Sequence, residues 1–281
     1  MRKNLMFQST LSGSGKSLIT ASLCRHLSNK GYNVSPFKSL NISLNSFITE
    51  DGSEIGVSQA FQSWACGREP CHQMNPLLLK ATGNSATQLI VNGKPSKGFC
   101  SRNDNDRKRL MSIVYDSYEF LEKTSDVIII EGSGTPAEIN LSDVANMATA
   151  EMFEAPVIII GDIDTGGVFA GLYGTYKLLE RKHRDLVKGF MINKFRGDPS
   201  ILSPGIERIE SEIGAPCLGT VSYRNYRFPE EDSLSLGGPI NPNPLGDDIR
   251  DVWLKNLDLF LENMGQEVDF GVLENIIDRG I

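Results

Sequence analysis

The stretch TLSGSGKS (residues 10–17) decides the fold of this chain. It follows a short apolar run, NLMFQ (residues 4–8), and opens a segment with helical periodicity. A strand that runs through a glycine-rich loop into a helix is the unit that begins a phosphate-binding α/β domain. We therefore predict a phosphate-binding loop (P-loop) at residues 10–17.

The chemistry of the loop depends on its backbone and on two side chains. Glycines let backbone N–H groups surround phosphate oxygens, and the following helix N-terminus adds partial positive charge. Lys16 should reach the β- and γ-phosphates of ATP, and the Ser17 hydroxyl should ligate Mg²⁺. The other residues expected at the nucleotide are Thr10, Gly13, Ser14, Gly15 and Leu18. Thr10 stands where the pattern normally has its first glycine, so the match is incomplete there.

Short β-branched runs alternate with helix-like segments along most of the chain, which predicts an α/β three-layer sandwich with a mainly parallel sheet. We expect strands at residues 4–8, 33–37, 88–91, 127–131, 157–162, 189–193 and 218–221. We expect helices at residues 15–29, 106–123, 143–153, 167–180 and 204–213. Continuous apolar runs such as VIII suit strands that are buried on both faces.

Composition changes suggest three parts: a P-loop domain at residues 1–232, a linker at 233–247 and a helical tail at 248–281. The linker is rich in Gly, Pro and Asn. The tail has an apolar helical face marked by Val252, Leu254, Leu257, Leu259 and Phe260. A long, weakly periodic stretch also separates the second strand from residue 86, and insertions of this length are often functional.

Bulk composition excludes several classes of function. The net charge of −7 and the lack of a basic stripe argue against nucleic-acid binding. The longest apolar runs are far shorter than the roughly 20 residues that cross a bilayer, so we expect no membrane role. The N-terminus lacks the features of a signal peptide. Five cysteines without a Cys-x-x-Cys pair predict a cytoplasmic protein with reduced thiols.

Polar residues follow several of the predicted strands, at the edge where parallel sheets bind ligands. Glu131 and Asp162 end two strands, and either carboxylate can help to hold Mg²⁺. The alternative for both is that they cap the next helix. Lys38 follows the second strand and could bind a γ-phosphate or a substrate carboxylate. Asn193 ends another strand, where its amide could read a base edge.

From about residue 6 to residue 234 the chain resembles the ATP-dependent amidating domain of the cobyric acid synthase family, within the dethiobiotin-synthetase-like P-loop enzymes. The resemblance is carried by PFKSLNISLNS (36–46), DGSEIGVSQA (51–60), MNPLLLKATG (74–83), EGSGTPAEINL (131–141), ANMATAE (145–151), GDIDTGGVFA (161–170), INKFRGD (192–198) and PEEDSL (229–234). Many segments in the same order make the resemblance specific.

The resemblance implies ATP-dependent amidation of corrinoid carboxylates, from adenosylcobyrinic acid a,c-diamide to adenosylcobyric acid, through acyl phosphates. It implies ATP and Mg²⁺ as cofactors. Lys16, Lys38, Glu131 and Asp162 would be catalytic, and Ser17, Glu131 and Asp162 would hold the metal. Asn193 would contact adenine. The residues implied on the corrinoid side are Asn41, Asn45, Gln59, Asn75, Lys80 and Glu138.

The chain also departs from the family pattern. It shows no segment like the family's C-terminal glutamine amidotransferase domain. We therefore expect one of four situations. The chain uses free ammonia, it works with a separate glutaminase subunit, it is a fragment of a longer enzyme, or it catalyses a different reaction. Gly13, Leu40 and Thr165 replace a usual aspartate, glutamine and arginine respectively. A homodimer is compatible with the sequence.

Two other hypotheses stay open at this point. One is a dethiobiotin-synthetase-like ligase that acts on another carboxylate or amine. The other is a non-catalytic P-loop scaffold subunit whose tail docks a partner, against which stands the simpler expectation that the tail packs on its own domain or on a dimer mate.

Overall fold

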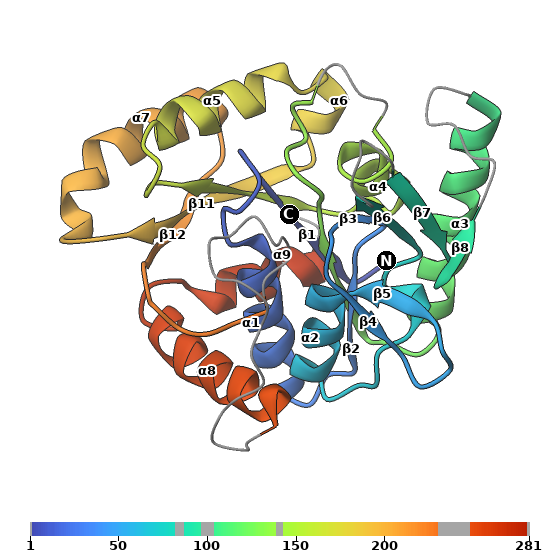
Figure 1. Cartoon of the computed structure of the whole chain (residues 1–281). Helices are drawn as coiled ribbons and strands as arrows, with labels where there is room; N and C mark the ends of the chain where they lie inside the picture. Colours follow the sequence, from blue (N-terminus) through green and yellow to red (C-terminus); the bar gives the residue numbers. More distant parts are fainter. Residues whose placement is uncertain (1, 82–86, 97–103, 139–142, 230–247, 280–281) are drawn as a thin grey trace.

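The computed structural model describes residues 2–81, 87–96, 104–138, 143–229 and 248–279. At its centre is a parallel six-stranded sheet in the order β12-β11-β10-β1-β9-β2 (Figure 1). In chain order these strands are β1 (Asn4–Ser9), β2 (Val34–Phe37), β9 (Val127–Glu131), β10 (Val157–Asp162), β11 (Val187–Phe195) and β12 (Cys217–Ser222). The predicted α/β class with a mainly parallel sheet is confirmed.

Helices cover both faces of this sheet. One face carries α3 (Asp104–Glu122), α4 (Met147–Met152), α5 (Val168–Leu178), the short α6 (Arg181–Arg184) and α7 (Ser203–Ile213). The other face carries α1 (Lys16–Asn29), α8 (Ile249–Met264) and α9 (Phe270–Arg279). Successive β9 residues alternate between the two cores, Ile128 with the first and Ile129 with the second. This is why the strand is apolar throughout.

Helix α4 begins at Met147, later than the predicted start at Asp143. The Asp143 carboxylate accepts hydrogen bonds from the backbone N–H groups of Ala145, Asn146 and Ala148. An aspartate that accepts hydrogen bonds from N–H groups shortly after it in the chain fixes a turn before a helix, because N–H groups at a helix N-terminus have no partner within the helix. The first part of the predicted helix is therefore a turn.

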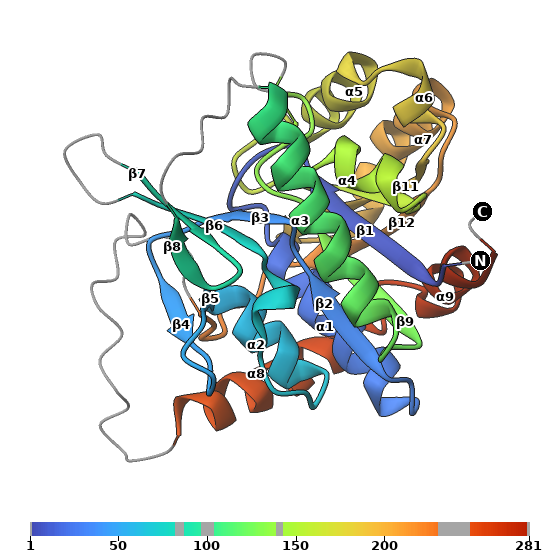
Figure 2. The same ribbon diagram turned by 90° about the vertical axis from the view of Figure 1, so that its right-hand side faces the viewer.

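The long stretch after β2 folds into small elements of its own. They are β3 (Leu40–Ile42), β4 (Ser46–Ile48), β5 (Glu54–Gly56), α2 (Val57–Ala65), the 3₁₀ turn η1 (His72–Met74), β6 (Leu77–Ala81), β7 (Thr87–Val91) and β8 (Lys94–Ser96). Strands β3, β6, β7 and β8 form a second sheet, and β4 pairs with β5 (Figure 2). We call residues 38–96 the insertion.

The expectation that residues 88–91 belong to the main sheet is wrong. They lie in β7, which pairs antiparallel with β6 and β8 of the second sheet. The reason is the turn at Asn92 and Gly93, where both residues have positive φ, 47° and 73°. An Asn-Gly pair with this backbone closes a tight hairpin, so β8 returns directly alongside β7.

The C-terminal helices pack on the chain's own cores. Leu257 contacts the core between α1 and α2, and Phe260 and Leu273 join the core under the main sheet. The predicted apolar face of the tail is wrong at Leu259, which is 49% exposed, whereas Trp253 is buried. The predicted linker at 233–247 lies outside the described residues. This packing within the chain explains the apolar face of the tail without a docking partner.

Candidate nucleotide and acceptor site

The P-loop connects β1 to α1 at the carboxyl edge of the main sheet, as predicted. Gly13 and Gly15 have positive φ values, 74° and 88°. A Cβ on Gly15 would lie 2.3 Å from Nδ2 of Asn193, so both the backbone conformation and the lack of space require glycine there. Asn193 itself donates from Nδ2 to the Ser14 carbonyl at 2.7 Å. Thr10 holds the loop entrance, because its N–H donates to the Ile160 carbonyl at 3.0 Å.

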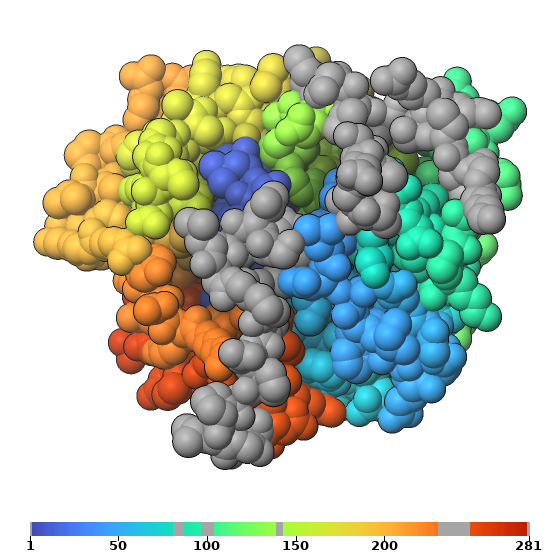
Figure 3. Space-filling view, viewed as in Figure 1, coloured from blue at the N-terminus to red at the C-terminus, as the bar shows by residue number. Residues whose placement is uncertain are grey.

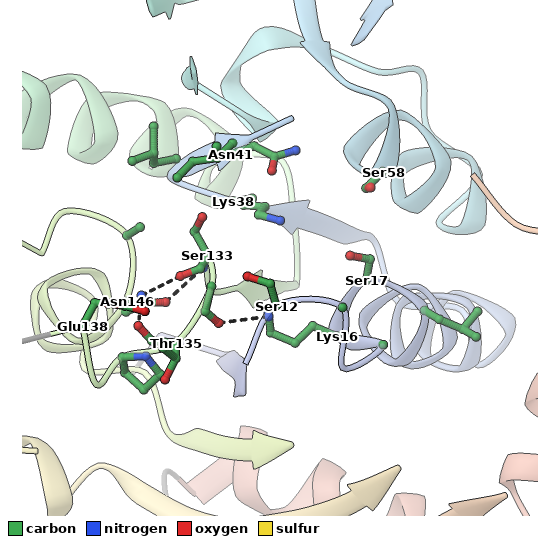
Figure 4. Close-up of a pocket in the computed structure, with 18 of the residues that line it drawn as sticks. Ser12, Lys16, Ser17, Lys38, Asn41, Ser58, Ser133, Thr135, Glu138 and Asn146 are labelled. Carbon is green, nitrogen blue, oxygen red and sulfur yellow. Dashed lines mark hydrogen bonds between the residues drawn. The ribbon is translucent and has the colours of Figure 1, made fainter. Parts of the chain in front are cut away.

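Lys16 lies inside the site and is only 6% exposed. Its Nζ donates to Ser9 Oγ at 2.6 Å and to the Gly134 carbonyl at 3.1 Å. The ammonium group therefore joins the P-loop to the segment that follows β9. Figure 4 shows this arrangement, with Lys16 below the cleft and Lys38 across from it.

Glu131 is the centre of a buried polar cluster beside the P-loop. Its carboxylate is fully buried, and Oε1 accepts from Ser17 Oγ at 2.9 Å and from Lys38 Nζ at 2.7 Å. Oε2 accepts from Gln62 Nε2 at 2.5 Å. A buried carboxylate requires this kind of compensation, since an unpaired charge in the interior is strongly unfavourable. The structure thus brings together Ser17, Lys38 and Glu131.

Asp162 is the last residue of β10 and Asn193 lies near the end of β11, both on the other side of β1 from Glu131. Oδ2 of Asp162 accepts from Lys194 Nζ at 2.7 Å, and the same ammonium donates to the Gly13 carbonyl at 2.6 Å. The Asn193–Lys194 pair thus holds the P-loop from this side. The metal role of Asp162 stays a prediction.

A cleft of about 600 Å³ opens between the P-loop, the insertion and the segment after β9. Figure 3 shows this face, where the dark-blue segment that follows β1 reaches the surface near the centre. The polar residues predicted from sequence that line it are Lys16, Ser17, Lys38, Asn41 and Glu138. Lining residues that the sequence reasoning did not single out include Ser12, Ser58, Phe61, Ser133, Thr135, Asn146 and Phe228.

Asn146 shapes the wall of the cleft that faces the P-loop. Its amide donates to the carbonyls of Ser133 and Thr135 at 2.7 and 3.2 Å, and its Oδ1 accepts from the Ser133 N–H at 2.9 Å. Both ends of the amide are used to fix one short segment. The motif ANMATAE contained this residue, but nothing in a single sequence shows that its side chain reaches back across the turn.

The predicted substrate residues separate into two groups in the described structure. Asn41 faces the cleft and donates to Gln59 Oε1 at 2.8 Å behind it. Asn75 is buried and binds backbone groups at Lys38 and Leu77, so it supports the wall rather than lining it. Lys80 and the backbone carbonyl of Asn45 also bond within the insertion.

Lys80 pairs with Glu54 and also donates to Ser46 Oγ at 3.2 Å. Burial acts to raise the pKa of Glu54, but the hydrogen bonds from Lys80 and Ser46 outweigh it and leave this pKa below its ordinary value. The Glu54 carboxyl therefore remains ionised at neutral pH, and its pairing with Lys80 ties β6 to the β4–β5 hairpin.

Ser17 and Glu131 fit a Mg²⁺ ion in the nature of their donors. Both offer hard oxygen atoms, and Ser17 Oγ lies 2.9 Å from Glu131 Oε1 at the edge of the cleft. Mg²⁺ in nucleotide sites commonly binds one or two protein oxygens together with phosphates and water. No cluster of three or more His, Cys, Asp or Glu side chains suited to a metal occurs in the described part of the chain.

The fold and the P-loop define a nucleotide-binding α/β protein. Residues 5–234 match the CobQ/CobB/MinD/ParA nucleotide binding domain, and the chain belongs to this family. It is 53% identical over 240 residues to a cobyric acid synthase of Thermodesulfovibrio yellowstonii, covering 84% of this chain and 48% of that protein. It is 43% identical over 277 residues to a cobyric acid synthase of Listeria monocytogenes, covering 98% of this chain and 53% of that protein.

The chain therefore spans about half the length of the relatives that it matches, and the match lies in their N-terminal half. Among solved structures, it is similar to the cell division protein MinD of Aquifex aeolicus at 14% identity, with a TM-score of 0.42 and coverage of 79% of this chain and 83% of that one. Along the described ranges, no helix is both long and apolar enough to span a membrane.

Proposed function

We propose that the chain catalyses ATP-dependent amidation of corrinoid side-chain carboxylates, converting adenosylcobyrinic acid a,c-diamide to adenosylcobyric acid. The observation that carries the proposal is that Lys16, Ser17 and Lys38 line one cleft. Ser17 and Lys38 both bond the buried Glu131 behind it, in a chain 53% identical to a cobyric acid synthase. The cleft, at about 600 Å³, falls within the usual size of small-molecule sites.

The proposed chemistry follows from the poor reactivity of a carboxylate toward ammonia. Transfer of the γ-phosphoryl group of ATP to a carboxylate oxygen gives an acyl phosphate with a good leaving group. Attack by ammonia at the acyl carbon then forms the amide bond, and phosphate leaves with the former carboxylate oxygen. The protein mainly positions the reactants and neutralises charge.

The residues of the cleft divide this work between them. Lys16 would leave its contacts with Ser9 and Gly134 to bind the β- and γ-phosphates. Lys38 lies beside Glu131 on the acceptor side, where its ammonium could pair with the phosphoryl group as it is transferred. Bound Mg²⁺ would supply neutralisation of the phosphate charge at Ser17 and Glu131. Asn193 would contact the adenine, and Asn41 with Glu138 would face the corrinoid.

The nitrogen source is part of the proposal. In the relatives, this chain matches about half of the protein. We propose that the amidating half accepts ammonia, either free in solution or delivered by a glutaminase partner. Free ammonium at high concentration should then support the reaction by this chain without glutamine.

The test uses the full chain with Mg-ATP, cobyrinic acid a,c-diamide in its adenosylated form and isotope-labelled ammonium. Mass spectrometry should detect replacement of carboxylate oxygen by labelled nitrogen, with ADP and phosphate formed in step. If the carboxylate carries heavy oxygen, one such atom per amidation should appear in phosphate. Lys38→Met should abolish amide formation, whereas Lys182→Met, at an exposed ion pair, should not. Unchanged corrinoid despite intact ATP binding would refute the proposal and favour another acceptor.

A further inference from the structure

Gln62 is a buried amide on α2 that touches both residues of the candidate metal site. It is fully buried, and its Nε2 donates to Glu131 Oε2 at 2.5 Å and to the Ser17 carbonyl at 3.2 Å. A single NH₂ group has two hydrogens, so both of these bonds can form at once. One side chain from the insertion therefore links the end of β9 to the first turn of α1.

The orientation of this amide is fixed by its surroundings. If it were rotated by half a turn, Oε1 would face the Glu131 carboxylate and the Ser17 carbonyl, both of which are acceptors. The nitrogen must therefore face them. In this orientation Oε1 is buried and has no hydrogen-bond partner among the described residues.

The unpaired Oε1 indicates that Gln62 does more than fill space in the core. A buried carbonyl oxygen without a partner costs about 1–3 kcal/mol, whereas an apolar side chain of the same size would avoid that cost. Filling space between α1 and α2 therefore does not account for a glutamine. The two donated hydrogen bonds do, and both lead to the candidate metal site.

The geometry assigns the two carboxylate oxygens of Glu131 different surroundings. Gln62 occupies Oε2, while Oε1 faces Ser17 Oγ at 2.9 Å and Lys38 Nζ at 2.7 Å. If the carboxylate were not held at Oε2, it could rotate and present both oxygens to the Lys38 ammonium. That pairing would compete with a cation for the same oxygens.

We propose that Gln62 is a positioning residue for the Mg²⁺ of the bound nucleotide: it holds Glu131 so that Oε1 points toward Ser17. The inference rests on the metal site of the proposed function, and it does not depend on which acceptor is amidated. Hydrogen-bond partners behind a metal ligand typically change metal affinity by roughly 10–100-fold when removed.

The test measures ATP binding by calorimetry, with Mg²⁺ and separately with excess EDTA, so it requires no turnover. Q62M keeps the length of the side chain but removes its donors. We expect roughly a 10-fold or larger rise in the Mg²⁺ concentration needed for tight ATP binding. Affinity for ATP in EDTA should remain close to that of the unchanged protein. Ser63→Ala is the matched control, because Ser63 is buried on the same helix and donates to the Arg68 carbonyl instead.

Two results would overturn the proposal. One is a Q62M protein with an unchanged Mg²⁺ requirement, and the other is an equal loss of ATP affinity with and without Mg²⁺. If Q62M does not fold, Q62N decides, because its shorter amide stays polar but cannot span both acceptors. A raised Mg²⁺ requirement in Q62M, together with no corrinoid turnover by the unchanged protein, would support the role of Gln62 and count against the proposed substrate, so the two failures are distinguishable.

Discussion

Replacing Lys38 with methionine tests whether the Lys38–Glu131 ion pair is as deeply buried as the structure indicates. The two side chains are 3% and 0% exposed, and their charged atoms lie 2.7 Å apart. Removing the ammonium leaves a buried carboxylate without this ion-pair partner. Loss of one partner of a buried pair typically costs about 3–5 kcal/mol of folding free energy.

The magnitude can be narrowed from the contacts that remain. In the Lys38→Met protein, Glu131 still accepts hydrogen bonds from Ser17 and Gln62. These donors partly stabilise the charge, so we expect the lower end of the range, about 3 kcal/mol. Adding Glu131→Gln removes the charge itself and should restore most of that loss.

The assay is urea unfolding in EDTA, followed by circular dichroism, with the free energy of unfolding obtained by linear extrapolation. Lys182→Met is the matched control, since Lys182 pairs with Glu151 at 2.8 Å but both are about half exposed. We expect no measurable loss there. A Lys38→Met loss below about 1 kcal/mol, or no recovery in the double variant, would refute the argument.

Three further outcomes are expected. Leu273→Ala should cost about 2–5 kcal/mol in urea unfolding because the side chain is fully buried, while Leu259→Ala on the exposed side of α8 should cost little. Burial raises the pKa of the Cys217 thiol to about 11, so its alkylation rate should still be rising well above pH 9, as mass spectrometry of labelled protein can show. Asn193→Ala should weaken ATP binding by about tenfold in calorimetry. An equal loss of affinity for ATP and for inorganic triphosphate would indicate that Asn193 supports the P-loop and does not contact the adenine.

The main sheet could be predicted because its local signals agree with one another. The strand, glycine loop and helix at residues 4–29 and the apolar runs of β9 and β10 each point to the same architecture. In a parallel sheet, residues at the carboxyl ends of the strands lie along one edge, so Glu131, Lys38 and Asn193 lie at that edge as expected. In these cases the residue's place along a strand decides where its side chain can act.

The rest of the site could not be predicted because it depends on contacts between distant segments. Gln62 lies 69 positions before Glu131, and nothing in its helix marks it as a donor to a carboxylate. The Asn146 side chain donates to the Ser133 carbonyl across a turn. Residues 88–91 join the second sheet because the turn at Asn92 and Gly93 returns the chain alongside them. Strand patterns predict faces and edges, but they do not predict which buried amide meets which charge.

The insertion contributes one side of the cleft, and the tail packs against the insertion from behind. Phe61 of α2 lines the cleft, and its ring lies 6.1 Å from that of Trp253 on α8 and 5.8 Å from that of Phe228. Because Gln62 follows Phe61 on the same helix, a shift of α2 would move the apolar wall and the donor to Glu131 together. Helix α8 packs against α2 and resists such a shift. The packing of α8 against α2 thereby supports the position of Gln62 next to the candidate metal site.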